Sequence, residues 1–291
     1  MAAAVPVHPR RHDLRRLRRN RAHHHRRAGA RPAPGGPPVI PQYPAGHELL
    51  KGKVVVVTAA AGTGIGSAVA KRCLEEGAHV VISDWHERRL KEKAAELGEV
   101  HAIPCDVTRE DQVQALIDGA AEHFGRVDVL INNAGLGGTK SVLDMTDDEW
   151  AKVLDITLTG TFRCTRAALK QFVAQGGGGA IVNNASVIGW RAQAGQAHYA
   201  AAKAGVMALT RCSALDAAEH GVRINAVAPS LAMHPFLAKV TSDELLEDLT
   251  KREAFGRAAQ PWEVANVMVF LASDYASYLT GEVVSVSSQH P

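Results

Sequence analysis

The stretch Val54-Val55-Val56-Val57-Thr58-Ala59-Ala60-Ala61-Gly62-Thr63-Gly64-Ile65-Gly66 decides the fold. Four consecutive β-branched residues are typical of a strand that is buried on both faces. The glycines that follow let the backbone approach a ligand at the start of a helix, where free N–H groups and the helix dipole favour an anion. This order predicts a pyrophosphate-binding turn, and its candidate residues are Thr58, Gly62, Gly64, Ile65 and Gly66.

The same alternation continues toward the C-terminus. Short runs rich in β-branched residues alternate with helical patterns, which is typical of a parallel sheet covered by helices on both faces. We therefore expect one α/β domain over residues 47–291, a Rossmann-like, doubly wound parallel sheet. A mostly helical stretch, 231–255, breaks the rhythm and is expected to be either a lid or a mobile surface loop. The expected strands are seven: 54–57, 80–83, 100–103, 127–131, 180–183, 223–227 and 283–286.

The first 46 residues have a different composition. Ten arginines and a single acid lie before residue 32, and six prolines follow between Pro32 and Pro44. Such a segment cannot bury enough apolar surface to offset its ordering entropy, so we expect residues 1–46 to be a disordered tail. A basic arm for nucleic acid or a membrane surface is the alternative. The remainder carries 23 basic and 29 acidic residues, which does not favour a nucleic-acid partner.

The cysteines and the hydropathy pattern bear on location. Cys73, Cys105, Cys164 and Cys212 are far apart and form no C-x-x-C pair, so we expect neither a metal site nor a disulfide framework. No apolar run reaches the roughly 18 residues needed to span a bilayer. We therefore expect a cytoplasmic protein with no membrane partner.

Asp84 follows the second expected strand, 18 residues after Gly66. An acid at this distance can accept hydrogen bonds from the ribose hydroxyls of an adenosine. The alternative is a local role as a cap of the helix that starts near His86. A carboxylate there repels a 2′-phosphate, so the sequence favours NAD over NADP. Arg88 and Arg89 are the cations that would receive such a phosphate, although on a helix they are expected to face solvent.

Further motifs follow the later strands, and together with the glycine turn they resemble the short-chain dehydrogenase/reductase family from about Leu49 onward. The motifs are Asp106-Val107, Asn132-Asn133-Ala134-Gly135, Asn184-Ala185-Ser186, Tyr199-Ala200-Ala201-Ala202-Lys203 and Arg223-Ile224-Asn225-Ala226-Val227-Ala228-Pro229. The resemblance implies that Ser186, Tyr199 and Lys203 are catalytic. It also implies that the cofactor is contacted by Asp106, Val107, Asn133, Ala134, Gly135, Tyr199, Lys203, Pro229 and Leu231.

The residues themselves support this chemistry. Tyr199 and Lys203 stand four positions apart, so their side chains share one helix face. A neighbouring ammonium stabilises phenolate and lowers a tyrosine pKa from about 10, which makes Tyr199 a candidate general acid/base. Ser186 would donate a hydrogen bond to the substrate oxygen. A pair on a solvated helix face is the alternative, but Ser186 and the upstream glycine turn favour catalysis.

The sequence departs from the family pattern near the cofactor. The turn between Thr58 and Gly64 is one residue longer than usual, and Ala59 takes the place of the first glycine. Thr157 stands where a catalytic asparagine is common, and its hydroxyl would have to hold the water of the proton relay. His234 replaces a threonine that usually contacts nicotinamide. We therefore expect an altered pyrophosphate turn, with Thr157 as a fourth candidate catalytic residue.

These observations predict an oxidoreductase that transfers hydride between a nicotinamide and a secondary alcohol or ketone. An apolar wall with Arg191 nearby suits a large hydrophobic substrate that carries an anionic group. The resemblance is to an actinobacterial subgroup close to β-ketoacyl reductases and to dehydrogenases of steroid-derived ring acyl-CoA intermediates. It implies a CoA-linked substrate, of steroid-ring or 3-hydroxyacyl/3-oxoacyl type, and a homotetramer. A non-catalytic, nucleotide-sensing protein on the same fold is the competing interpretation.

Overall fold

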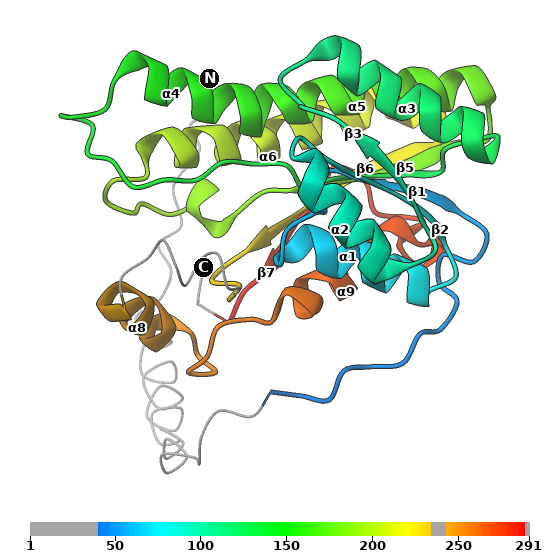
Figure 1. Cartoon of the computed structure of the whole chain (residues 1–291). Coiled ribbons are helices and arrows are strands. Elements are labelled where there is room, and N and C mark those ends of the chain that lie inside the picture. The colour runs from blue at the N-terminus through cyan, green and yellow to red at the C-terminus, as the bar shows by residue number, and fades with distance from the viewer. Residues whose placement is uncertain (1–39, 234–242, 289–291) are drawn as a thin grey trace, which may run out of the picture. The chain divides into compact units, whose positions relative to one another are not determined.

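Within residues 40–233 and 243–288, which the computed structural model describes, seven strands form one parallel sheet in the order β3-β2-β1-β4-β5-β6-β7 (Figure 1). The doubly wound α/β fold that the sequence predicts is therefore confirmed. The order reverses direction between β1 and β4, and this reversal opens a crevice at the carboxyl ends of the strands. The strands are β1 (Val54–Val57), β2 (His79–Asp84), β3 (Val100–Pro104), β4 (Val129–Asn132), β5 (Gly179–Asn184), β6 (Val222–Pro229) and β7 (Val283–Val286).

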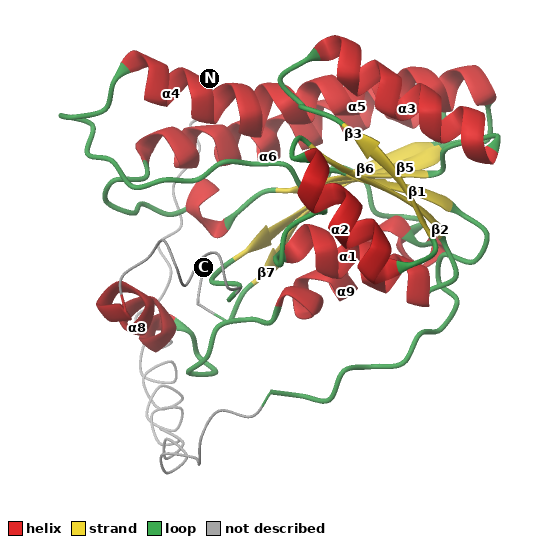
Figure 2. Ribbon diagram, in the orientation of Figure 1, coloured by secondary structure: helices red, strands yellow, loops and turns green. Residues whose placement is uncertain are grey.

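Helices cover both faces of the sheet (Figure 2). They are α1 (Ile65–Glu75), α2 (Glu87–Leu97), α3 (Glu110–Phe124), α4 (Asp147–Leu154), α5 (Gly160–Gln175), α6 (Ala197–Ala218), α8 (Asp243–Arg252) and α9 (Pro261–Ala272). Short helical turns lie at η1 (Asp155–Thr159), η2 (Val187–Gly189) and η3 (Asp274–Ala276).

The alternation of side chains along each strand divides the core in two. On one face, Val55 and Val57 pack with Val69 of α1 and Met268 of α9. On the other, Val56 packs in a cluster with residues of α3, α5 and α6. Every residue of β1 is almost completely buried, which explains why four β-branched residues occur in a row there.

Part of the expected tail is described. The chain from Pro41 onward forms one compact unit, and residues 43–47 contact α1. Tyr43 donates a hydrogen bond to Glu75, and the Arg72 guanidinium donates to the carbonyl oxygens of Pro44 and Ala45. The remainder of the expected tail, residues 1–39, lies outside the described residues. The boundary at residue 46 stays a prediction.

Candidate active site

The predicted site residues gather at the carboxyl edge of the sheet. Thr58 follows β1, Asp84 ends β2, and Asn133 follows β4. Ser186 lies two residues after β5, on the same edge as Tyr199 near the start of α6. The topology therefore brings together residues that are up to 141 positions apart in the sequence, from Thr58 to Tyr199.

The turn after β1 is tied to the turn after β4. The Thr58 hydroxyl oxygen accepts hydrogen bonds from the backbone N–H of Asn133 at 3.0 Å and of Ala134 at 3.1 Å. The Asn133 side-chain amide donates to the carbonyl oxygens of Thr58 at 3.2 Å and Ala59 at 3.1 Å. These four bonds fix the two predicted cofactor turns against each other.

The altered glycine turn has a specific backbone geometry. Ala59 has a φ of 52°, in the left-handed region that favours glycine, at the position where the family pattern has its first glycine. Gly66 packs directly against this residue, because a Cβ there would lie 2.4 Å from the Ala59 carbonyl oxygen. The turn thus carries strain at Ala59 and requires the absence of a side chain at Gly66.

The N-terminus of α1 suits an anion. Gly64 is its N-cap, no side chain caps it, and its first turn contains no acid. By contrast, α3 and α4 begin with acids, and α4 has a complete capping box between Thr146 and Glu149. Uncapped N–H groups at a helix start, reached over a glycine turn, form an anion site. Gly62, Gly64, Ile65 and Gly66, the predicted pyrophosphate-binding residues, lie at or next to this uncapped helix start.

Asp84 lies beside that turn and is 8% exposed. Its carboxylate accepts hydrogen bonds from the N–H groups of Ala61, at 3.3 Å, and His86, at 3.0 Å. Asp84 thus contacts His86, as in the local role that the sequence left open, and its hydrogen bond with Ala61 also connects it to the glycine turn. Arg88 is paired with Glu92 at 2.6 Å and is exposed, as expected. Arg89, which was expected to face solvent, is half-buried instead, and its Nε has no hydrogen-bond partner among the described residues.

Asp106 and Val107 follow β3. One carboxylate oxygen of Asp106 accepts hydrogen bonds from the backbone and the hydroxyl of Thr108, at 2.9 and 2.8 Å. Val107 is buried and lies under the start of α5, where a Cβ on Gly160 would approach it within 2.7 Å. Asp84 and Pro104 are register partners, so this loop begins at the same edge of the sheet as Asp84.

Ser186, Tyr199 and Lys203 lie together. A side-chain hydrogen bond joins Ser186 to Tyr199, and the Lys203 Nζ lies 5.5 Å from the centre of the Tyr199 ring. The Lys203 ammonium donates a hydrogen bond to the backbone carbonyl of Asn184. Gly135 also lies close to this lysine, since a Cβ there would be 3.4 Å from Nζ. The structure thus places the three predicted catalytic side chains in one cluster.

The protonation behaviour of the pair differs from the sequence-based expectation. Burial raises the pKa of Tyr199 to about 12, and the hydrogen bond with Ser186 opposes this rise. Burial also lowers the pKa of Lys203 to about 8. In the protein alone, desolvation outweighs the attraction between ammonium and phenolate. The expected lowering of the Tyr199 pKa by Lys203 is therefore not what these contacts produce.

Thr157 lies in η1, a turn of π-helix between α4 and α5. Its hydroxyl accepts a hydrogen bond from the Leu136 N–H at 3.0 Å and donates to the Leu136 carbonyl at 3.3 Å. The Thr157 carbonyl accepts a hydrogen bond from the Thr161 hydroxyl at 2.8 Å. The side chain thus holds the loop after β4, and a Cβ on Gly135 would lie 3.7 Å from its hydroxyl.

The interrupting stretch after β6 is closed at its base. Leu231 and Ala259 form an N–H to carbonyl hydrogen bond of 2.8 Å, and Met233 donates to the Ala259 carbonyl at 2.9 Å. Pro229 is buried at the end of β6. His234, one of the predicted departures, and the part of the expected lid up to residue 242 lie outside the described residues.

Sequence reasoning missed the roles of two residues. Buried Glu253 accepts hydrogen bonds from the hydroxyl of Ser288, at 2.7 Å, and from the N–H of Leu231, at 3.5 Å, and so joins the stretch after β6 to the C-terminal segment. Asn184, at the end of β5, contacts both Lys203 and Asn133. Asn184 stands in a motif that the sequence shows, but the contacts of both residues leave no local signal, because their partners are between 19 and 51 positions away.

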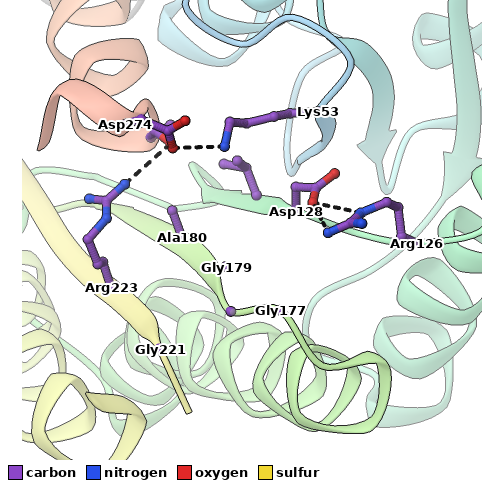
Figure 3. A pocket seen from close by; sticks show the side chains of 12 residues that line it. Lys53, Arg126, Asp128, Gly177, Gly179, Ala180, Gly221, Arg223 and Asp274 are labelled. Carbon is purple, nitrogen blue, oxygen red and sulfur yellow. Dashed lines mark hydrogen bonds and ion pairs between the residues drawn. The ribbon is translucent and has the colours of Figure 1, made fainter. Parts of the chain in front are cut away.

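A separate cavity of about 210 Å³ lies at the opposite, amino-terminal edge of the sheet (Figure 3). Two ion pairs line it, Lys53 with Asp274 at 2.9 Å and Arg126 with Asp128 at 2.6 Å. Its lysine and one of its arginines are thus already neutralised, and it lies far from the catalytic cluster. We assign it no part in the candidate active site.

Two features of other classes of protein are absent from the described residues. No described helix is both long enough and apolar enough to cross a membrane. Among residues 40–233 and 243–288, no group of three His, Cys, Asp or Glu side chains is placed to hold a metal ion.

Known proteins resemble this chain over most of its length. A family model described as enoyl-(acyl carrier protein) reductase matches residues 59–288. A protein of Mycobacterium tuberculosis, named (5R,7aS)-5-hydroxy-7a-methyl-1-oxo-2,3,5,6,7,7a-hexahydro-1H-indene-carboxyl-CoA reductase, is 68% identical over 258 residues, 87% of this chain and 98% of the relative. The meso-2,3-butanediol dehydrogenase of Serratia marcescens is 42% identical over 80% of this chain and 92% of its own length.

A solved structure agrees with these relatives. The crystal structure of a short chain dehydrogenase from Mycobacterium smegmatis is 60% identical, with a TM-score of 0.77, over 86% of this chain and 98% of that one. The fold is thus shared with a protein that is named as a short chain dehydrogenase.

Proposed function

The chain belongs to the short-chain dehydrogenase/reductase family, and on that premise we propose that it interconverts a ring-bearing, CoA-linked secondary alcohol and its ketone with NAD as hydride carrier. Its relatives support an oxidoreductase acting on CH–OH, which disfavours the non-catalytic interpretation. The observation that carries the proposal is the clustering of Ser186, Tyr199 and Lys203 beside the turn after β1.

The described residues fit a nicotinamide dinucleotide. Its pyrophosphate would take the uncapped N–H groups at the start of α1, over Gly62 and Gly64. Asp84 would accept the ribose hydroxyls of the adenosine with the lone pairs that Ala61 and His86 leave unused. Asp106 and Val107 would contact the adenine from the end of β3. Among the described residues, Asp84 and the pairing of Arg88 with Glu92 favour NAD over NADP.

The nicotinamide, when bound, supplies the carbon that accepts or returns a hydride. Tyr199 exchanges a proton with the substrate oxygen, which needs a group that can be both acid and base. Ser186 orients that oxygen through its hydroxyl, and Lys203 places a positive charge one helical turn from Tyr199. Asn133, Ala134, Gly135, Pro229 and Leu231 would line the cofactor on the side away from the adenine.

Thr157 acts differently from the asparagine that the family commonly has at this position. Both the donor and an acceptor position of its hydroxyl contact Leu136. We propose that Thr157 positions the loop after β4 above Tyr199, where a Cβ on Gly137 would lie 3.9 Å from the ring. A remaining lone pair of the hydroxyl can still accept a hydrogen bond from a relay water.

The substrate class rests on the relatives. The mycobacterial relative is a reductase of a fused-ring, CoA-linked acid by name, and this chain covers 98% of it at 68% identity. Turnover of a bicyclic hydroxy-acyl-CoA, compared with the same ring as the free acid and with 3-hydroxybutyryl-CoA, tests the assignment. Faster turnover of the ring thioester supports the assignment. Turnover of the short acyl-CoA alone would instead assign the protein a substrate of the 3-hydroxyacyl type.

We further propose a homotetramer and a cytoplasmic location. Leu215 on α6 is 78% exposed, and Tyr278, just before β7, is fully exposed. Apolar and aromatic groups of this size, exposed on α6 and next to β7, are typical of subunit contacts. The four cysteines are free thiols, and three of them are buried, which suits a reducing compartment.

A further inference from the structure

Two consecutive asparagines at the end of β5 face opposite sides of the sheet, as alternate strand residues do. Asn183 accepts a hydrogen bond from the Asn132 amide at 2.9 Å, and Asn184 donates one to the Asn133 side-chain oxygen at 3.0 Å. Asn132 and Asn183 are register partners on β4 and β5. The carboxyl edge of the two strands therefore carries two successive cross-strand asparagine pairs.

The two β5 asparagines differ in how their amides are satisfied, although each pair leaves one buried oxygen without a partner among the described residues, that of Asn132 in the first pair and that of Asn184 in the second. Asn183 uses both ends of its amide, since its nitrogen donates to the Thr210 hydroxyl at 2.9 Å. Asn184 uses only its nitrogen, and its side-chain oxygen is buried without a partner among the described residues. An unpaired buried oxygen costs stability relative to an apolar side chain of similar shape. Stability alone therefore explains Asn183 but not Asn184.

Asn184 lies at the end of a chain of contacts that leads to the glycine turn. Its side-chain amide donates a hydrogen bond to the Asn133 side-chain oxygen. The Asn133 amide in turn donates to the backbone carbonyls of Thr58 and Ala59. Ala59 is the residue in the left-handed region, and Gly66 packs against its carbonyl. An alanine keeps this conformation only where surrounding contacts hold it. The Asn133 amide is one such contact, and Asn184 fixes the orientation of that amide.

The other side of Asn184 faces the catalytic cluster. Its backbone carbonyl accepts the hydrogen bond of the Lys203 ammonium. One residue thus contacts the lysine through its main chain and the support of the nucleotide turn through its side chain.

We propose that Asn184 is a positioning residue for the cofactor: through Asn133 its side-chain amide holds the turn at Ala59 in the shape that accepts the dinucleotide, beside Lys203. This inference rests on the proposed function, because it assumes that the turn binds NAD. It assigns to Asn184 a role that a residue serving stability alone would not have.

The test is a titration of Asn184→Leu with NADH, followed by nicotinamide fluorescence, together with its thermal unfolding. Leucine removes the contact to Asn133 and also the unpaired oxygen. We expect NADH to bind about tenfold more weakly, a difference that corresponds to roughly one hydrogen bond. The Tm should fall less than in Asn183→Leu, because removal of the unpaired Asn184 oxygen offsets the loss of the donor to Asn133. Asn184→Ala serves as a second variant if the leucine prevents folding, and it should show the same loss of affinity.

A second substitution tests the coupling to Ala59. Glycine adopts the left-handed region without support, so Ala59→Gly in the Asn184→Leu background should restore the NADH affinity to within about twofold of the wild type. If Asn184→Leu weakens binding equally with and without the Ala59→Gly substitution, the proposed coupling is overturned.

The matched control is Asn183→Leu. Because both ends of the Asn183 amide are satisfied, this variant should lower the Tm while its folded fraction binds NADH as the wild type does. NADH binding by the wild type and unchanged binding by Asn184→Leu would overturn this inference alone. Absence of binding of both NADH and NADPH by the wild type would overturn the proposed function, and the inference with it.

Discussion

The Nζ of Lys203 lies 5.5 Å from the ring centre of Tyr199, one turn along α6, and its hydrogen bond goes to the Asn184 carbonyl. Burial shifts both pKa values toward the neutral forms: it raises that of Tyr199 to about 12 and lowers that of Lys203 to about 8. At neutral pH Tyr199 is therefore a proton donor and Lys203 is still mostly an ammonium.

Replacing Tyr199 with phenylalanine tests the acid/base assignment. Tyr199→Phe removes only the hydroxyl, so NADH should bind as in the wild type while kcat falls by about 10³-fold or more. The matched control is Tyr275→Phe, which changes an exposed ring in η3, outside the Ser186–Tyr199–Lys203 cluster, and should leave kcat unchanged. A Tyr199→Phe enzyme with the wild-type rate would refute the assignment.

Asp84 is expected to set the cofactor preference. Asp84→Asn keeps the shape of the side chain but removes the charge that repels a 2′-phosphate and that binds ribose hydroxyls strongly. Binding measurements should show the affinity for NADH lowered by about tenfold and a smaller difference between the affinities for NADH and NADPH. Arg88→Gln, which breaks only the exposed pair with Glu92, should leave both affinities as they are. Tighter NADPH than NADH binding in the wild type would contradict this role for Asp84.

The buried Lys203 should make stability depend on pH. Its pKa is about 8 in the folded protein against the ordinary 10.5, so between these values the unfolded chain holds the proton and the folded protein does not. Stability should therefore rise with pH across this window, because the unfolded state binds more protons. Tyr199 gives the opposite slope between pH 10 and 12, since its folded pKa is raised.

Lys203→Met removes the buried charge and isolates this effect. At pH 7 urea unfolding should show the variant more stable by on the order of 2 kcal/mol, and the difference should vanish as pH approaches 10.5. Lys51→Met, at an exposed lysine, is the control without such a trend. A variant less stable than the wild type at pH 7 would show that the bond to Asn184 outweighs the cost of burying the ammonium.

The left-handed alanine predicts a stabilising substitution. Ala59→Gly should raise the free energy of unfolding by about 1 kcal/mol, because glycine adopts a φ of 52° without steric cost. The control is Ala60→Gly, next in the chain and buried but without a positive φ, which should lower stability. Thermal unfolding of both variants tests this prediction. If Ala59→Gly and Ala60→Gly change the stability equally, strain at Ala59 is not the cause.

The proposed assembly can be measured directly. Light scattering after size exclusion should give four chain masses for the wild type. Leu215→Glu places a charge on an exposed apolar position of α6 and should shift the protein to a smaller species while preserving its circular dichroism. A monomeric wild type would reject the homotetramer.

The fold could be read from the sequence where local pattern and burial agree. β1 and β7 begin and end where their β-branched runs do. The prediction placed the start of the fourth strand two residues too early, because distant contacts decide its first residue. The Val127 N–H donates to the Gln175 side chain, and the Asp128 carboxylate accepts a hydrogen bond from the Val54 N–H. Such contacts over 48 and 74 positions leave no local signal.

In the candidate site too, some features follow from the local sequence and others depend on distant contacts. The spacing of Tyr199 and Lys203 follows from the helical period, so the sequence can place them on one face. Their pKa values depend instead on burial in the folded protein. Burial raises the pKa of Tyr199, whereas the sequence alone predicts a lower value. The contacts of Asn184 and Glu253 arise only when separate strands and the C-terminal segment meet.

The hydrogen-bonded base of the stretch after β6 has a consequence for protein engineering. The Ala259 N–H donates to the Leu231 carbonyl at 2.8 Å, so the two ends of this stretch lie next to each other in the domain. Closing such a loop costs only slowly more free energy as it lengthens. We therefore expect the domain to tolerate changes in the length of this stretch, as long as the bonds of Glu253 to Leu231 and Ser288 are kept.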